Sequence, residues 1–358
     1  MSLSIGIIGL PNVGKSTLFN ALTNNNVLAA NYPFATIEPN TGVVPIPDER
    51  LQKLSELYGS APIKPATVQF VDIAGLVAGA SKGEGLGNQF LSHIRSCNAI
   101  VQVVRAFADP NVQHVDQQPD SKKDIDVVNT ELVLADLATV QKHLLKIEKE
   151  ARINPKLQPV YETIKRTHDI LNTGASITSV TDLDTTHISG LQLLTAKPII
   201  YLFNVDEETL GSNAKQQELS TLVAPAQALF VCAKLESELN SLDEADAQEL
   251  LASYGQQESG LIQLIHAAYD ILRLQSFLTA GDKEVRAWTI ARGSTTPQAA
   301  GVIHTDFERG FIAAEIVDCN DLLSAGSLAA ARAGGKVRTE GKTYIMQPND
   351  VVEFKFNV

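Results

Sequence analysis

The segment Gly9-Leu-Pro-Asn-Val-Gly-Lys-Ser-Thr17 constrains the fold more than any other part of the chain. It fits the pattern G-x-x-x-x-G-K-[ST], follows a strand-like apolar run at residues 5–8 and precedes a helical pattern that starts at Thr17. A glycine-rich turn between a buried strand and a helix directs backbone N–H groups inward at the positive end of the helix, which suits bound phosphate. The segment therefore predicts a nucleotide-binding loop in a layered α/β domain.

Short apolar runs recur along the chain, with helical patterns between them. Each run has the length of a strand and no polar alternation, which is typical of strands buried on both faces of a parallel sheet. The runs occupy residues 5–8, 68–71, 99–104, 199–203 and 228–231. We therefore expect an α/β fold with a mostly parallel sheet, as in the G domain of P-loop nucleoside triphosphatases.

Two helical patterns between residues 126 and 173 interrupt this alternation. Both carry apolar residues at heptad spacing, and Asn154-Pro155 separates them. These positions are Val133, Leu137, Val140, Leu144, Ile147 and Ala151, then Val160, Ile164, Thr167 and Leu171. The spacing favours an antiparallel helical hairpin inserted into the sheet domain. Two helices that pack only on the sheet remain the open alternative.

The pattern changes again after Ser276, where polar and apolar residues alternate at 285–290 and 351–356 with Gly334-Gly335 between them. Alternation with glycine-rich turns indicates a small mixed β domain. We predict three parts: a nucleotide-binding domain at 1–125 and 190–275, a helical insertion at 126–189, and a β domain at 276–358.

Composition excludes several classes of protein. The 358 residues are 44% hydrophobic and 20% charged, which is typical of a folded soluble chain. No apolar run reaches the ~18 residues that span a bilayer, so we expect neither export nor membrane insertion. Cys97, Cys232 and Cys319 lie far apart without CxxC or Cys/His clusters. This disfavours a disulfide framework or zinc site and fits a reducing cytoplasm.

Further motifs follow in the order expected of a nucleotide-dependent switch. Lys15 would reach the β and γ phosphates, and the Ser16 hydroxyl would bind Mg²⁺. In Asp72-Ile-Ala-Gly75, after a buried strand, Asp72 would hold the Mg²⁺ shell and the Gly75 amide would sense the γ phosphate. Thr36 lies where a first switch loop supplies another Mg²⁺ ligand. The set predicts a Mg²⁺-dependent nucleoside triphosphatase.

The base-recognition segment departs from the usual N-K-x-D. Residues 204–207 read Asn-Val-Asp-Glu, so Val205 replaces the lysine and Glu207 the aspartate that pairs with guanine, while Cys232-Ala-Lys234 takes the place of S-A-K. A carboxylate one methylene further out meets the guanine edge differently, and losing such a pair removes about 1–3 kcal/mol of discrimination. We expect weakened guanine specificity; reading of guanine by Glu207 from a shifted backbone remains open.

The position after Gly75 is Leu76, where many such enzymes have a glutamine that orients the attacking water. Leucine cannot form that hydrogen bond, so another group must do so. His114, in a polar stretch after the apolar run at 99–104, is the candidate catalytic side chain beside Lys15. Water held by backbone and phosphate is the alternative.

Together these segments resemble the YchF branch of the Obg-related P-loop proteins, the Obg-like ATPases. The resemblance also rests on Asn31-Tyr-Pro-Phe-Ala-Thr36 and the glycine-rich run after Asp72. The C-terminal part, 276–358, is similar to a TGS domain, a small β-grasp-like module, most clearly at residues 344–356. It implies a cytoplasmic, ribosome-associated ATPase that uses Mg²⁺ and accepts GTP poorly. It further implies adenine contact by Val205 and a catalytic role for His114. The nucleotide-binding residues would be Asn12, Val13, Gly14, Lys15, Ser16, Thr17, Gly75, Asn204, Val205 and Glu207, with Mg²⁺ at Ser16, Thr36 and Asp72.

Two classes of function stay open. One is an ATP-driven switch on the large subunit or the whole ribosome, with a conventional Obg-like GTPase as its variant. The other is a ribosome- or RNA-binding scaffold in which hydrolysis is incidental. With 41 acidic against 29 basic residues and a net charge of −12, RNA contact must come from local basic faces. Such faces are Lys142, Lys146 and Lys149, or Arg332, Lys336 and Arg338. We expect a monomer without a membrane partner.

Overall fold

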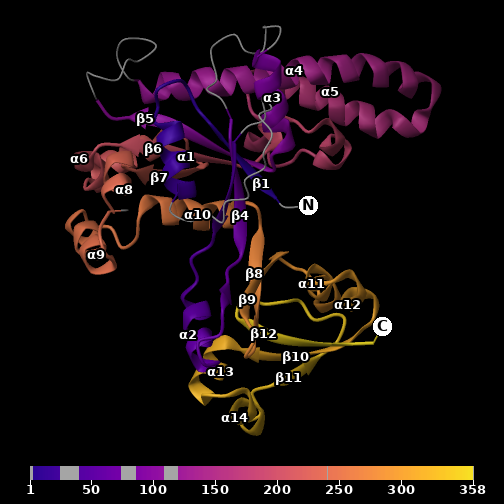
Figure 1. Cartoon of the computed structure of the whole chain (residues 1–358). Coiled ribbons are helices and arrows are strands. Elements are labelled where there is room, and N and C mark those ends of the chain that lie inside the picture. Colours follow the sequence, from indigo (N-terminus) through magenta and orange to yellow (C-terminus); the bar gives the residue numbers. More distant parts are fainter. Residues whose placement is uncertain (1–2, 25–39, 74–85, 109–119, 240, 358) are drawn as a thin grey trace. The chain divides into compact units, whose positions relative to one another are not determined.

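The computed structural model of the chain describes residues 3–24, 40–73, 86–108, 120–239 and 241–357, which form two units (Figure 1). The first unit comprises Met1–Val43 and Gln69–Leu264, and the second comprises Val44–Val68 and Ile265–Val358. Each has its own six-stranded sheet. In the described part of the chain, no helix has both the length and the apolar character needed to cross a membrane.

Five of the six strands in the sheet of the first unit are the predicted apolar runs, and the sixth, β2, was not predicted. Its strand order is β2-β4-β1-β5-β6-β7, and the neighbours from β4 to β7 are parallel. The strands are β1 (Ser4–Ile8), β2 (Asn40–Pro45), β4 (Thr67–Asp72), β5 (Ala99–Ala106), β6 (Ile199–Val205) and β7 (Gln227–Val231). The predicted parallel α/β sheet is confirmed. Parallel order also brings the carboxyl ends of β1, β4 and β6 to the same edge.

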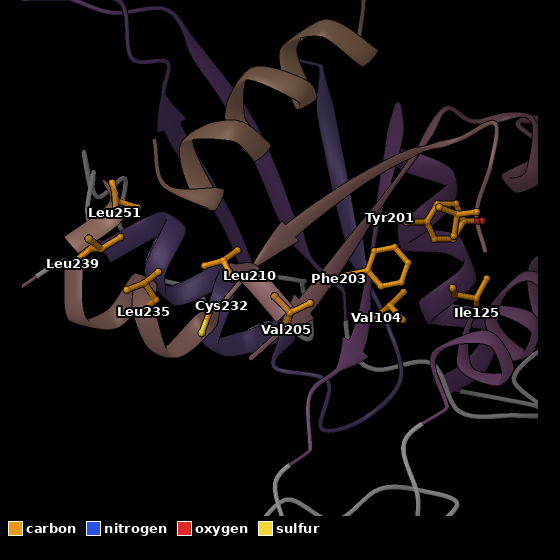
Figure 2. Packing of buried hydrophobic residues seen from close by; sticks show 11 residues of the cluster. Val104, Ile125, Tyr201, Phe203, Val205, Leu210, Cys232, Leu235, Leu239 and Leu251 are labelled. Atoms are coloured by element: carbon orange, nitrogen blue, oxygen red, sulfur yellow. The ribbon is translucent and has the colours of Figure 1, made fainter. Parts of the chain in front are cut away.

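Helices alternate with these strands. They are α1 (Lys15–Asn24), α3 (Leu86–Ser96), α6 (Glu207–Leu210), α7 (Asn213–Thr221), α8 (Ala233–Leu239), α9 (Glu244–Ser253) and α10 (Gly260–Ile271). Figure 2 shows the core beside β6, where Val205 points toward Cys232 and Leu210. Phe203 stacks on Phe230 with 5.5 Å between the ring centroids. This core holds the end of β6 firmly against α8.

The predicted heptad positions lie on two helices that pack against each other. α4 (Ser121–Ile153) ends at Asn154, and α5 (Gln158–Asn172) runs back beside its C-terminal half (Figure 1). Their apolar side chains share one cluster with residues from the short turns that follow α5. The predicted heptad positions in this cluster are Val133, Leu137, Val140, Leu144, Ile147, Val160, Ile164 and Leu171. The helices therefore pack on each other, as a hairpin requires.

The second unit contains a mixed sheet in the order β11-β10-β12-β8-β9-β3. Burial alternates at residues 285–288 of β9 and 352–355 of β12, in agreement with the alternation in the sequence. The strands are β3 (Ile63–Lys64), β8 (Leu274–Ala280), β9 (Val285–Ala291), β10 (Phe311–Asp318), β11 (Arg338–Glu340) and β12 (Asp350–Phe356). The helices are α2 (Glu49–Leu57), α11 (Thr296–Ile303), α12 (Thr305–Arg309), α13 (Cys319–Ala325) and α14 (Leu328–Ala333).

Residues 44–68 belong to this second unit, although they precede most of the first unit in the chain. Arg50 on α2 donates hydrogen bonds to the Pro348 carbonyl at 2.6 Å and to Asn349 Oδ1 at 2.9 Å. The short strand β3 extends the sheet by pairing with β9. The sequence assigns these residues to the nucleotide-binding domain at 1–125, and no local pattern signals the excursion. The three-part division as a whole stays a prediction.

Two buried carboxylates connect elements of the first unit. Asp136 on α4 is fully buried and accepts hydrogen bonds from the Leu194 and Thr195 amides at 2.9 and 2.7 Å. Burial raises its pKa, while these hydrogen bonds and Arg95, 3.7 Å away, act in the opposite direction. Glu236 on α8 accepts from the Leu261 amide at 3.3 Å, at the start of α10. Burial raises its pKa to about 7.

We expect Asp136→Ala to lower the free energy of unfolding by roughly 2–4 kcal/mol, because two buried amides would lose their acceptor. Urea unfolding followed by circular dichroism measures the change. Asp169→Ala is the control, since that side chain on α5 is 67% exposed, and it should change stability by less than about 0.5 kcal/mol. Equal effects of the two substitutions would contradict the anchoring role.

Glu236 should make stability depend on pH. Its pKa is about 7 in the folded chain against 4.5 for an ordinary glutamate, so the folded state binds the proton more tightly. Stability through this group therefore falls as pH rises from about 4.5 to about 7. We expect Glu236→Gln to remove this slope, shifting stability relative to the wild type by up to about 3 kcal/mol across the window. Glu238→Gln, on an exposed residue of the same helix, should keep the wild-type slope; parallel profiles for Glu236→Gln and wild type would refute the assignment.

Candidate nucleotide-binding site

The phosphate loop, residues 9–14, joins β1 to α1 and requires both of its glycines. Gly14 has φ of 90°, and a Cβ there would lie 2.3 Å from Asn204 Nδ2. A Cβ on Gly9 would lie 2.7 Å from the Val103 carbonyl oxygen. Asn12 also has a positive φ, of 63°. A larger residue at position 9 or 14 would therefore collide with neighbouring atoms and prevent this loop conformation.

Asn204 at the end of β6 ties the phosphate loop to the neighbouring loop. Its side chain is 3% exposed. Nδ2 donates to the Val13 carbonyl at 3.0 Å, and Oδ1 accepts from the Ala233 amide at 3.2 Å. The sequence predicts Asn204 as a nucleotide-binding residue. In the structure its amide holds together the two segments that were predicted to meet the phosphates and the base.

Lys15 and Asp72 meet at the carboxyl ends of β1 and β4. The Lys15 ammonium forms an ion pair and hydrogen bond with Asp72 Oδ1, and the lysine is 8% exposed. Ser16, the next residue on α1, is exposed. A hydroxyl and a carboxylate are oxygen donors of the kind that Mg²⁺ prefers, so Ser16 and Asp72 fit such an ion. Within the described ranges, no group of three or more His, Cys, Asp or Glu side chains is arranged to hold a metal.

The Asn-Val-Asp-Glu segment divides its side chains between core, cap and surface. Val205 is 2% exposed and lies in the core beside Cys232 (Figure 2). Asp206 caps α6 by accepting from the Thr209 amide at 2.8 Å, a role that the sequence left unassigned. Capping is a common use of aspartate at this position of a helix. Two of the three side chains after Asn204 are thus engaged in structure.

Glu207 is held by two partners. Lys234 Nζ lies 2.7 Å from its Oε1, and the Tyr254 hydroxyl donates to its Oε2 at 3.3 Å. The hydrogen bond from Lys234 lowers the pKa of Glu207. The sequence places Lys234 near the base but does not single out Tyr254, because that residue follows α9 outside every motif. The carboxylate that replaces the guanine-reading aspartate is therefore already paired.

Several predicted residues lie outside the described part of the chain: Thr36, Gly75, Leu76 and His114. Their roles stay predictions. The cysteines Cys97, Cys232 and Cys319 are free and buried. Burial raises the pKa of each thiol, which makes the reactive thiolate less available.

We expect Gly14→Ala to abolish nucleotide binding, because the added methyl group would collide with Asn204 and the residue would keep an unfavourable φ. Titration with a fluorescent ATP analogue measures the loss, which should exceed about tenfold in Kd. Gly190→Ala is a matched control, since a Cβ there meets nothing within 4 Å. Binding by Gly14→Ala with wild-type affinity would show that the loop adapts and that this geometry is not required.

Comparisons with known proteins agree with these motifs. A family model described as "50S ribosome-binding GTPase" matches residues 4–135, and the model YchF-GTPase_C, described as a protein of unknown function, matches residues 274–357. The sequence is 47% identical to "Ribosome-binding ATPase YchF" of Bacillus subtilis (strain 168), covering 100% of both chains. It is 45% identical to the protein of the same name from Escherichia coli O157:H7, again over 100% of both.

Solved structures show the same relationship. The Schizosaccharomyces pombe YchF GTPase superposes with a TM-score of 0.86 at 38% identity, covering 99% of this chain and 98% of that one. A GTP binding protein from Pyrococcus horikoshii OT3 has a TM-score of 0.61 at 20% identity and shares the fold. Identity of 47% over the whole length confirms the resemblance seen in the motifs, and the chain belongs to the YchF family.

Proposed function

We propose that this chain is a Mg²⁺-dependent ATPase of the cytoplasm that binds the ribosome. The observation that carries the proposal is the pairing of Lys15 with Asp72 beside a glycine-dependent phosphate loop. It stands in a chain that aligns from end to end with proteins named ribosome-binding ATPases. The P-loop supports the nucleoside triphosphatase activity, and the names of the relatives support ATP as the substrate and the ribosome as the partner.

The ion pair between Lys15 and Asp72 explains how the site would receive its substrate. Lys15 would turn to the β and γ phosphates, and Asp72 would turn to the Mg²⁺ shell. Lys15 would then exchange one anionic partner for another, and Asp72 would exchange one cationic partner for another. Ser16 and Thr36 are the proposed Mg²⁺ ligands, Gly75 the γ-phosphate sensor, and the amides of the loop the phosphate cradle. The proposed cradle residues are Asn12, Val13, Gly14, Lys15, Ser16 and Thr17.

The surroundings of Glu207 support adenine over guanine. A carboxylate that reads guanine must accept from N1–H and N2–H₂. Both Glu207 oxygens already accept one hydrogen bond each, from Lys234 and Tyr254, and these bonds fix the orientation of the carboxylate. Each oxygen keeps a further acceptor site, so guanine would have to approach Glu207 in that fixed orientation. Val205 is the proposed apolar contact to adenine. Because it is 2% exposed, that contact requires its neighbours in the core to move aside.

The helical hairpin is the proposed ribosome contact. Its end exposes Ile153 at 86%, and Lys146 is 71% exposed. The three predicted basic residues of the second unit each form an ion pair with a carboxylate. These pairs are Arg332 with Glu315, Lys336 with Asp321, and Arg338 with Asp350. On the hairpin Lys146 is also paired, with Glu150 at 3.8 Å, but it is more exposed, and Lys142 and Lys149 beside it are exposed as well. The hairpin is therefore the preferred basic face for RNA. We propose that the chain acts as a monomer.

A GTPase is the second candidate, because the matched family model and the solved S. pombe structure are both described as GTPases. A scaffold in which hydrolysis is incidental is the third, motivated by Leu76 in place of a water-orienting glutamine. The three candidates differ in the base that the site should prefer and in whether ribosome binding should require Lys15.

One experiment separates them: phosphate release from ATP and from GTP, with and without purified ribosomes. We expect faster turnover of ATP than of GTP and a change in rate when ribosomes are added. Lys15→Ala should abolish turnover, whereas Lys215→Ala, an exposed lysine on α7, should not. Preference for GTP would establish the GTPase. Unchanged ribosome binding by Lys15→Ala, with and without nucleotide, would favour the scaffold.

The same assay under single-turnover conditions addresses His114. If His114 orients the attacking water, His114→Ala should slow hydrolysis by roughly 10²–10⁴-fold with little change in ATP affinity. His187→Ala, on an exposed residue of the first unit, is the control and should hydrolyse at the wild-type rate. An unchanged rate for His114→Ala would leave water held by backbone and phosphate as the explanation.

A further inference from the structure

The second unit contains a cleft that no part of the nucleotide site uses. It has a volume of about 450 Å³, within the range of ligand-binding cavities. One side is formed by β12, and the other by the end of β8 with the turn that leads to β9. α2, α12 and α14 contribute Tyr58 as the C-cap of α2, Phe307 and Leu328. All of these residues belong to the same unit.

The cleft lies where two neighbouring strands part. β12 pairs with β10 along its length, from Phe356 opposite Phe311 to Asp350 opposite Asp318. On its other side it has one register pair with β8, Val351 opposite Leu278. The cleft is lined by consecutive residues, 351–354 of β12 and 279–284 of β8 and its turn. Because consecutive side chains of a strand point to opposite faces, the backbone edge of β12 itself borders the cleft.

The two faces of β12 differ in chemistry at this point. Val352 and Phe354 lie on the face covered by α11 and α12, and they pack with Phe307 in the apolar core of the unit. The next residue along, Glu353, lies on the opposite face. It stands directly across from Glu315 of β10. Two like charges opposite each other on adjacent strands repel, so each of these carboxylates favours a cationic partner.

The side chains that line the cleft are acidic in sum, and most of their carboxylates have a cationic partner within the same unit. Its lining contains four carboxylates and one lysine, Lys283. Three of the carboxylates form ion pairs: Glu284 with Lys64, Glu315 with Arg332, and Glu353 with Lys355. Among the described residues, Asp282 has no lysine or arginine within ion-pair distance. Burial raises the pKa of the Tyr58 hydroxyl, and the charges of Asp282 and Glu353 raise it further.

We propose that this cleft binds an extended peptide segment of a partner protein, in which apolar and basic residues alternate, as an added strand along the part of β12 that lies beyond its pair with β8 at Val351. An added strand satisfies the backbone groups of that edge. Its alternate side chains would meet the apolar face beside Phe354 and the acidic face beside Glu315 and Glu353. The site lies apart from the phosphate loop and does not depend on nucleotide hydrolysis.

The test is fluorescence anisotropy of a labelled hexapeptide of alternating lysine and valine, titrated with the full-length chain. We expect saturable binding that Glu353→Gln weakens by roughly fivefold to tenfold, the effect of losing one charge-assisted contact. Glu249→Gln removes an exposed carboxylate of the first unit and should bind like the wild type. Equal weakening by both substitutions would show non-specific attraction to an acidic protein and would overturn the proposal.

Two more measurements separate a peptide strand from other occupants. A hexapeptide of the same charge with proline at the apolar positions cannot use its backbone N–H groups there and should not bind. Displacement of the labelled peptide by n-butylamine at equal concentration would indicate a site for a small amine, against the proposal. Gly281→Leu places a side chain in open space at the cleft wall and should block the peptide; wild-type binding by this variant would also count against the site.

Discussion

The nucleotide site depends on one buried side chain, Asn204. Its amide group links the Val13 carbonyl to the Ala233 amide and lies where a Cβ on Gly14 would collide. Each buried polar group left without a partner costs about 1–3 kcal/mol, so the loop and the start of α8 are favoured in one arrangement. The glycine and the asparagine are therefore one constraint: a small residue at position 14 makes room for the amide that holds the loop.

Chain connectivity relates this site to the second unit. The segment Val44–Val68 leaves the first unit after the predicted switch residue Thr36 and returns just before Asp72. Arg50 binds it to the carbonyl of Pro348 and the side chain of Asn349. The two predicted switch sequences flank the two ends of this anchored segment, so a nucleotide-dependent change in them would act on both ends. Such a change would then be transmitted to the second unit along the chain itself.

The sequence predicted the features that are formed by residues close to one another along the chain. Five strands of the first sheet were found because each is a continuous apolar run, and the phosphate loop because its residues are contiguous. The strand β2 was missed because only alternate residues of it are buried. The excursion of residues 44–68 was not found, since Arg50 and Pro348 are 298 positions apart. Asp206 and Tyr254 were also missed as structural partners of the base segment: the first acts as a helix cap inside a motif, and the second reaches Glu207 from 47 residues away.

The net charge of −12 does not indicate which partner a given surface of the chain attracts. Charges separated by more than about 8–10 Å are screened at physiological salt, so a partner senses the local face and not the total. On the hairpin, lysine and arginine alternate with glutamate in pairs four residues apart, such as Lys146 with Glu150 and Arg152 with Glu148. Such exposed pairs are worth little in water. A polyanion can therefore displace these glutamates at small cost. A cationic partner can in the same way replace the lysines and the arginine that pair with Glu284, Glu315 and Glu353. One acidic chain can in this way present surfaces of both signs.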